Sequence, residues 1–97
     1  MKEKNKKRKQ NRFAELLEIP EEISSQKPKL TLIGFEELLV ENYKNIIEYQ
    51  DFYVRLNTHM GLININGFEL KLNEMTNDDI LITGKIESID FEKTIDE

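Results

Sequence analysis

The chain has 97 residues, a net charge of −5 and no cysteine. A chain of this length forms one domain with a modest core and little room for an enclosed ligand cavity. The absence of cysteine excludes a disulfide framework and thiolate metal sites, and it suits a reducing compartment. No apolar run approaches the ~20 residues of a membrane-spanning helix, and no secretory signal is apparent, so we expect a cytoplasmic protein.

Charge is divided sharply along the chain. Residues 1–12 hold seven basic side chains and one acid, a net charge of +6, whereas the remaining residues carry a net charge of −11. Such an arm could contact anionic lipid headgroups, an acidic partner or nucleic acid, although the acidic body disfavours nucleic acid. The plainer interpretation is a disordered, solvated arm, because like charges repel. The candidate contact residues in the arm are Lys6, Lys7, Arg8, Lys9 and Arg12.

A short amphipathic helix is predicted after the arm. Phe13, Leu16 and Leu17 fall at helical spacing and share one face, and Pro20 ends the segment. A helix of two turns is marginal unless its apolar face is covered. We therefore expect it to dock on the domain's own sheet or on a partner protein, or to bind a membrane surface together with the basic arm. Residues 13–27 form this helix and a linker.

From Lys29 onward the apolar residues alternate with a period of two, which is typical of strands separated by turns. Near the C-terminus, Ile80, Ile82 and Ile86 keep one phase, whereas Ile89 and Phe91 have the other. This change of phase predicts a bulge or a corner. The expected strands cover residues 30–33, 37–41, 45–49, 52–56, the two arms of the hairpin described next, and 80–91.

The central prediction is a hairpin over residues 61–72. Asn66-Gly67 is a favoured dipeptide for a type I′ turn, in which both residues take positive φ. This register places Ile63, Ile65, Phe68, Leu70 and Leu72 on one apolar face and Asn64 on the solvated face. This register implies that Gly67→Val lowers the stability of the domain, that Ile63→Asp unfolds it and that Asn64→Asp hardly changes its stability.

These elements predict a mainly β domain: a compact antiparallel meander, sandwich or roll of 7–8 short strands, with the short helix before it. The alternative is a short β-solenoid, because Gly67 and Gly84 each follow an alternating isoleucine pair. The expected organisation is a disordered arm (1–12), the helix and linker (13–27), the β domain (28–92) and an acidic tail (93–97).

Few residues point to chemistry. His59 is the single histidine and lies next to a predicted turn, which favours a solvated side chain over a metal ligand. Tyr43, Tyr49, Phe52 and Tyr53 could stack on bases, but the acidic surroundings favour cross-strand packing. We expect no catalytic residue, no metal and no cofactor, and hence a protein that is not an enzyme.

Several segments, taken in order, carry a resemblance. They are PKLTLIG (28–34), VENYKNI (40–46), EY (48–49), VR (54–55), GLINING (61–67) and ILITGKI (80–86). This set resembles the YqfC/YabP family of sporulation proteins, most closely its YqfC-like members, over residues 13–91. Such members commonly carry His, Arg and Gly where this chain has Tyr43, Lys44 and Asn45. We expect Asn45 to take the left-handed conformation in place of Gly, while Lys44 keeps the charge of Arg without its bidentate geometry.

The resemblance implies a non-enzymatic factor of endospore formation made in the mother cell. It also implies action with the membrane protein YqfD during engulfment or forespore maturation, which would place the chain peripherally at the forespore membrane. Two further hypotheses remain open: a self-assembling structural protein at the forespore surface that forms a homo-oligomer through strand edges, and a nucleic-acid binder that uses the basic arm.

Overall fold

The computed structural model describes residues 12–17 and 27–93. The basic arm residues Lys6, Lys7, Arg8 and Lys9 lie outside the described residues, as do most of the linker and the last four residues of the predicted acidic tail.

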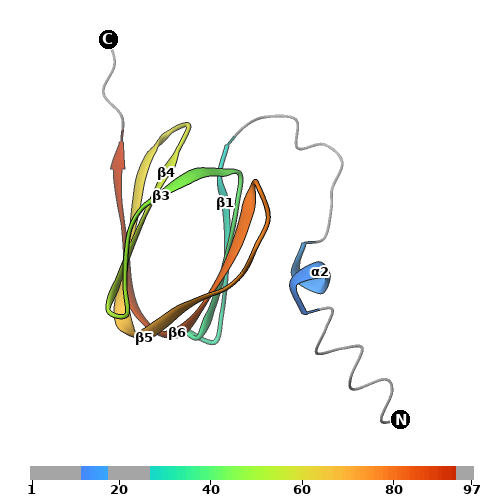
Figure 1. Ribbon diagram of the computed structural model, residues 1–97, viewed down its shortest axis with the longest axis vertical. Coiled ribbons are helices and arrows are strands. Elements are labelled where there is room, and N and C mark those ends of the chain that lie inside the picture. Colours follow the sequence, from blue (N-terminus) through green and yellow to red (C-terminus); the bar gives the residue numbers. More distant parts are fainter. Residues whose placement is uncertain (1–11, 18–26, 94–97) are drawn as a thin grey trace.

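One short helix and one sheet make up the described chain (Figure 1). Six strands, all antiparallel, form the sheet in the order β1-β2-β6-β5-β4-β3. The predicted mainly β, antiparallel architecture is confirmed. The elements are α2 (Arg12–Leu16), β1 (Lys29–Ile33), β2 (Glu37–Glu41), β3 (Tyr43–Gln50), β4 (Tyr53–Thr58), β5 (Gly61–Met75) and β6 (Asp79–Lys93).

Two 15-residue strands, β5 and β6, run through the whole sheet. The first half of β5 pairs with β4, whereas the first half of β6 pairs with β2. Figure 1 shows β5 and β6 turning sharply at one end of the molecule, so that the two halves of the sheet face each other. Apolar side chains from both halves fill the space between them. The buried cluster comprises Leu38, Val40, Tyr43, Val54, Leu56, Ile63, Ile65, Leu70, Ile80 and Ile82.

The bend brings backbone against backbone at two glycines. A Cβ atom on Gly67 would overlap the carbonyl oxygen of Lys85, and one on Gly84 would lie 2.5 Å from the carbonyl oxygen of Glu69. Gly84 also has a φ of +135°, which side-chain-bearing residues rarely adopt. Glycine is therefore required at both positions by lack of space, a common reason for glycine within strands.

The predicted turn at Asn66-Gly67 is wrong. The strand β5 continues through both residues, and Gly67 does not take a positive φ. Ile65 pairs with Val54 on one side and Ile89 on the other, so neighbours on both sides hold this segment extended. The count of 7–8 strands falls to six, because the two arms of the expected hairpin are one strand. The solenoid alternative is not observed in the described chain.

The predicted phase break after Ile86 is confirmed as a bulge. Ile86 pairs with Gly67 and Ser88 pairs with Asn66, which leaves Glu87 as an extra residue in β6. Because one extra residue exchanges the two faces of a strand, the isoleucines on both sides of the bulge can face the same core.

Two face assignments from the expected hairpin also need correction. Phe68, expected in the core, is 53% exposed. Asn64, expected to face solvent, is buried: its Oδ1 accepts a hydrogen bond from the Tyr53 hydroxyl at 3.0 Å, and its Nδ2 donates to Glu92 Oε2 at 2.9 Å. Ile63, Ile65, Leu70 and Leu72 do contribute to the core as expected.

We predict that Gly67→Ala destabilises the domain by about 1–3 kcal/mol or more, because the Lys85 carbonyl that the new methyl group meets belongs to the backbone of the bend. Asn73→Ala, at an exposed position of the same strand, is the control and should change stability by less than about 0.5 kcal/mol. Chemical denaturation measures both. An equal loss at the two positions would contradict the close approach at Gly67.

We predict that Asn64→Asp is costly, by about 1–3 kcal/mol, because it replaces an amide donor with a second carboxylate beside Glu92. Asn73→Asp on the exposed part of β5 adds the same charge and should change stability by less than about 0.5 kcal/mol. Urea melts of the two variants at neutral pH make the comparison. Equal stability of the two variants would contradict the burial of Asn64 and would indicate that its side chain faces solvent.

Candidate partner-binding surface

Three phenylalanines are exposed at the bent end of the sheet. Phe35 is 73% exposed, Phe52 57% and Phe68 53%. Phe35 lies in the β1–β2 turn, Phe52 in the β3–β4 turn and Phe68 in β5 beside Gly67. We call these three residues the aromatic corner.

Backbone hydrogen bonds hold the aromatic corner together. Gly67 N donates to Phe52 O at 3.2 Å, and Ile86 N donates to Phe35 O at 2.9 Å. Gly67 and Ile86 are themselves paired across β5 and β6. Both turns are therefore tied to the bend, and Figure 1 shows them at the same end of the molecule as the bend. Sequence analysis missed this surface, because the three residues come from segments that only the sheet brings together.

Phe35 has a backbone conformation that is unfavourable for phenylalanine. Gly34 and Phe35 have φ of 59° and 60°, and Glu36 N donates to Ile33 O at 3.1 Å, as in a type I′ turn. A left-handed conformation costs a side-chain-bearing residue roughly 1–2 kcal/mol, so glycine or asparagine is the usual choice here. An exposed aromatic side chain at a strained position makes Phe35 a candidate contact residue.

A polar hollow of about 610 Å³ lies beside the aromatic corner. The turn that carries Phe52 reaches it, because Leu70 N donates to Asp51 O at 2.8 Å. Its lining combines carboxylates with an ammonium group, which suits the polar rim of an apolar contact. The lining residues are Tyr49, Asp51, Glu69, Leu70, Lys71, Thr83 and Gly84.

The tyrosines considered for base stacking have structural roles. The Tyr43 hydroxyl donates to Thr76 O at 3.3 Å, and the Tyr49 hydroxyl donates to Leu70 O at 3.1 Å. These bonds connect β3 to the second half of β5 and to Thr76 directly after it, while the Tyr53 hydroxyl donates to Asn64. Cross-strand packing thus accounts for the tyrosines, whereas Phe52 is left exposed.

The β2–β3 turn adopts a different conformation from the one expected. Asn42, with a φ of 69°, is the left-handed residue, and Asn45 lies within β3 opposite Asn57. Asn42 Nδ2 donates to Lys27 O at 2.9 Å, which anchors the start of the β domain. His59 is exposed, as expected, and lines a small hollow with Asn42, Tyr43 and Asp78.

Burial raises the pKa of two ionisable groups around this turn, Glu41 and Tyr43. It raises the pKa of Glu41, where Lys29 opposes the shift and Asp79 adds to it. Burial also raises the pKa of Tyr43, with further increases from Asp79 and Asp78. Within residues 12–17 and 27–93, no group of three or more His, Asp or Glu side chains is arranged to hold a metal ion.

The predicted helix is present as α2, which begins at Arg12, and Leu17 N donates to Phe13 O at 3.0 Å. The side chain of Arg12 is not among those that the structure describes. Phe13, Leu16 and Leu17 are all partly buried. Figure 1 shows α2 outside the bent sheet, on the side of β1. Among the residues described, no helix has the length and apolar character to cross a bilayer.

A second apolar pair lies on the face of the sheet turned away from the core. Leu39 and Leu81 pair directly across β2 and β6, and they are 0% and 2% exposed. Their neighbours Leu38, Val40 and Ile80 belong to the core, so alternation places Leu39 and Leu81 on the opposite face. Burial this complete requires an apolar cover, and α2 brings the apolar side chains that could supply it.

Comparison with known proteins supports the family that the ordered segments resemble. The family model described as "YabP family" matches residues 24–97. The chain is similar to the protein YqfC of Bacillus subtilis (strain 168), with 25% identity over 75 residues, which cover 77% of this chain and 81% of YqfC. No solved structure matches the chain. The chain belongs to the YabP family, and this membership indicates a sporulation-related protein.

Proposed function

We propose that this protein is a non-enzymatic adaptor of the mother cell that binds a membrane-bound sporulation partner, a YqfD-like protein, through the aromatic corner. It would act during engulfment or forespore maturation, peripherally at the forespore membrane. The observation that carries the proposal is the exposure of Phe35, Phe52 and Phe68 around one bend.

The energetics of the aromatic corner suit a binding surface. Fully burying one phenylalanine side chain contributes roughly 1.5–3 kcal/mol, so covering three neighbouring ones could supply a large part of a moderate affinity. The turns are fixed by backbone hydrogen bonds to the bend, so little ordering is needed when a partner binds. Phenyl rings supply apolar area but neither a nucleophile nor a proton donor, which favours binding over catalysis at this surface.

The basic arm and α2 support a second contact of the same adaptor. Positive charge before Phe13 would attract the anionic leaflet that surrounds a membrane-bound partner. Nucleic acid is the competing ligand of this charge. Binding to nucleic acid would fall steeply between low and moderate salt concentrations, because phosphate contacts release counterions.

We predict that Phe35→Asn separates stability from function. Asparagine tolerates the left-handed conformation, so the free energy of unfolding should rise by about 1 kcal/mol, whereas partner capture should fall. The full chain serves as bait in extracts of sporulating cells, and mass spectrometry scores the YqfD-like protein. Ile47→Asn, at a 49% exposed position on β3, is the control and should retain capture. Equal capture by all three baits would contradict a role for the aromatic corner.

We predict that Leu16→Glu lowers the free energy of unfolding by about 1–3 kcal/mol, because it places a carboxylate on the partly buried face of α2. Flotation with vesicles containing anionic lipid, compared with a variant lacking residues 1–12, measures the membrane contribution. If Leu16→Glu destabilises the domain and leaves flotation unchanged, α2 packs on protein and the basic arm alone acts on the lipid. Loss of flotation in both variants with unchanged stability would assign α2 to the membrane instead.

A further inference from the structure

The edges of the two facing halves of the sheet approach each other along two lines, which we call seams. Apart from the bond between Ile86 N and Phe35 O at the bend, the described strands are hydrogen-bonded to each other across only one of these seams. On one side, the hydroxyl of Tyr49 joins β3 to the second half of β5, and the hydroxyl of Tyr43 joins β3 to Thr76, directly after β5. On the other side, β1 lies near the second half of β6, and no sheet pairing connects them. From Ile86 onward, β6 pairs with β5 alone.

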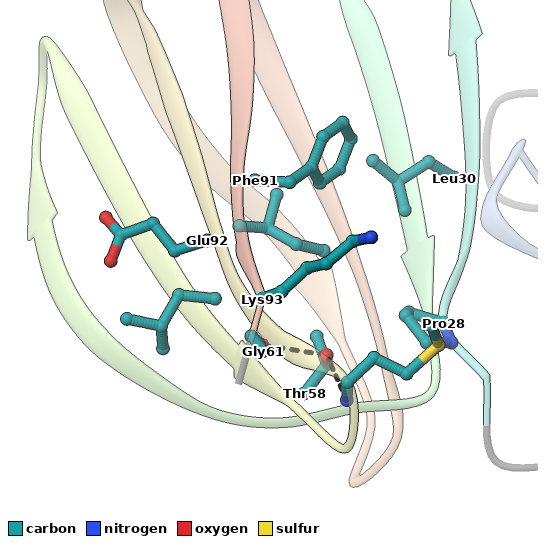
Figure 2. A pocket seen from close by; sticks show the side chains of 10 residues that line it. Pro28, Leu30, Thr58, Gly61, Phe91, Glu92 and Lys93 are labelled. Atoms are coloured by element: carbon teal, nitrogen blue, oxygen red, sulfur yellow. Dashed lines mark hydrogen bonds between the residues drawn. The ribbon is translucent and has the colours of Figure 1, made fainter. Parts of the chain in front are cut away.

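An apolar groove of about 390 Å³ marks this open seam. Figure 2 shows Phe91 extending from β6 toward Leu30 on β1, with Lys93 beside them. Met60 and Pro28 also line the groove. Phe91 pairs with Ile63, which is 2% exposed, yet Phe91 itself is 64% exposed. Leu32 pairs with the fully buried Leu38 and is nevertheless 41% exposed. Apolar side chains that belong to the inner face thus lack a cover along this seam.

The two outermost strands of the sheet differ in their ability to accept another strand. The strand β3 is interrupted by two irregularities, where Lys44 and Ile47 are extra residues relative to β4. Such bulges protect an edge from pairing with another chain. The strand β1 pairs residue by residue with β2 without interruption, so its free edge is regular.

We propose that a second copy of this chain pairs with β1 through its own β1, in antiparallel orientation about a two-fold axis at Thr31. The sequence of β1 is self-complementary in this register: Thr31 faces Thr31 of the second copy, and Leu30 faces its Leu32. The added strand lies along the open seam, so its inward leucines help to cover Leu32 and Phe91. This contact uses the edge of β1 and not the phenyl rings of the aromatic corner, so its test does not depend on the proposed function.

Charge favours this register. Lys29 is the only charged residue of β1, and it faces the uncharged Ile33 of the second copy. Glu37 pairs with Ile33 in each copy, so Lys29 lies two strands, about 10 Å, from Glu37 of the second copy on the same face. The sheet pairing therefore places no like charges opposite each other. It also brings Lys29 and Glu37 of the second copy close enough for electrostatic attraction.

A single-cysteine probe tests the register directly, because the chain has no cysteine of its own. Opposed Cα atoms in an antiparallel pair lie about 4.5–5.5 Å apart, which is within the Cα spacing of a disulfide. Under mild oxidation the full-length Thr31→Cys variant should form a covalent dimer in most of the protein. Ile47→Cys on the bulged β3 edge is the matched control and should cross-link at least tenfold less.

Light scattering after size-exclusion chromatography supplies the second readout. The unmodified chain should elute with twice the monomer mass of 11.5 kDa, and Leu32→Lys should elute as a monomer that keeps the circular dichroism spectrum of the parent but melts at a lower temperature, because the second copy no longer stabilises it. Ile47→Lys should remain a dimer. A monomeric parent chain, or a dimer that survives Leu32→Lys, would overturn the proposal. A monomeric parent that loses its membrane partner only in Leu32→Lys would assign the β1 edge to that partner instead.

Discussion

The close backbone approach at Gly67 and Gly84 is the constraint on which the rest of this structure depends. Neither position has room for a Cβ atom, because carbonyl groups of the opposite strand occupy that space. This contact lets two 15-residue strands bend together, and the bend turns one sheet into two facing halves. The core then forms between halves that would otherwise be two parts of one face of a flat, poorly covered sheet.

The same bend places the candidate functional surfaces. On its convex side it carries Phe68 and anchors the turns that hold Phe35 and Phe52. At the seams, bending brings strand edges near one another without pairing them. Tyrosine hydroxyls join one seam, whereas the other retains an apolar groove and the regular edge of β1. A domain of this size can therefore offer two separate protein-binding surfaces.

The strain at Phe35 connects stability with the proposed role. A left-handed phenylalanine lowers the stability of a small domain, which has only a few kcal/mol to spare. Asparagine would fit the same turn with less strain. The balance is understandable if the exposed ring contributes more to binding than its backbone costs in folding, as expected of a residue at the centre of an interface.

The sequence by itself determined the strand class, most strand positions, the bulge after Ile86 and the family, because alternation and ordered segments are local properties. It could not decide between a turn and a continuous strand at Asn66-Gly67, since both satisfy the local pattern. The tertiary structure decided this through pairing of Ile65 with Val54 and Ile89, residues far from it in the chain. The burial of Asn64 and the aromatic corner likewise depend on long-range contacts. Local patterns carry no information about which distant segments will meet.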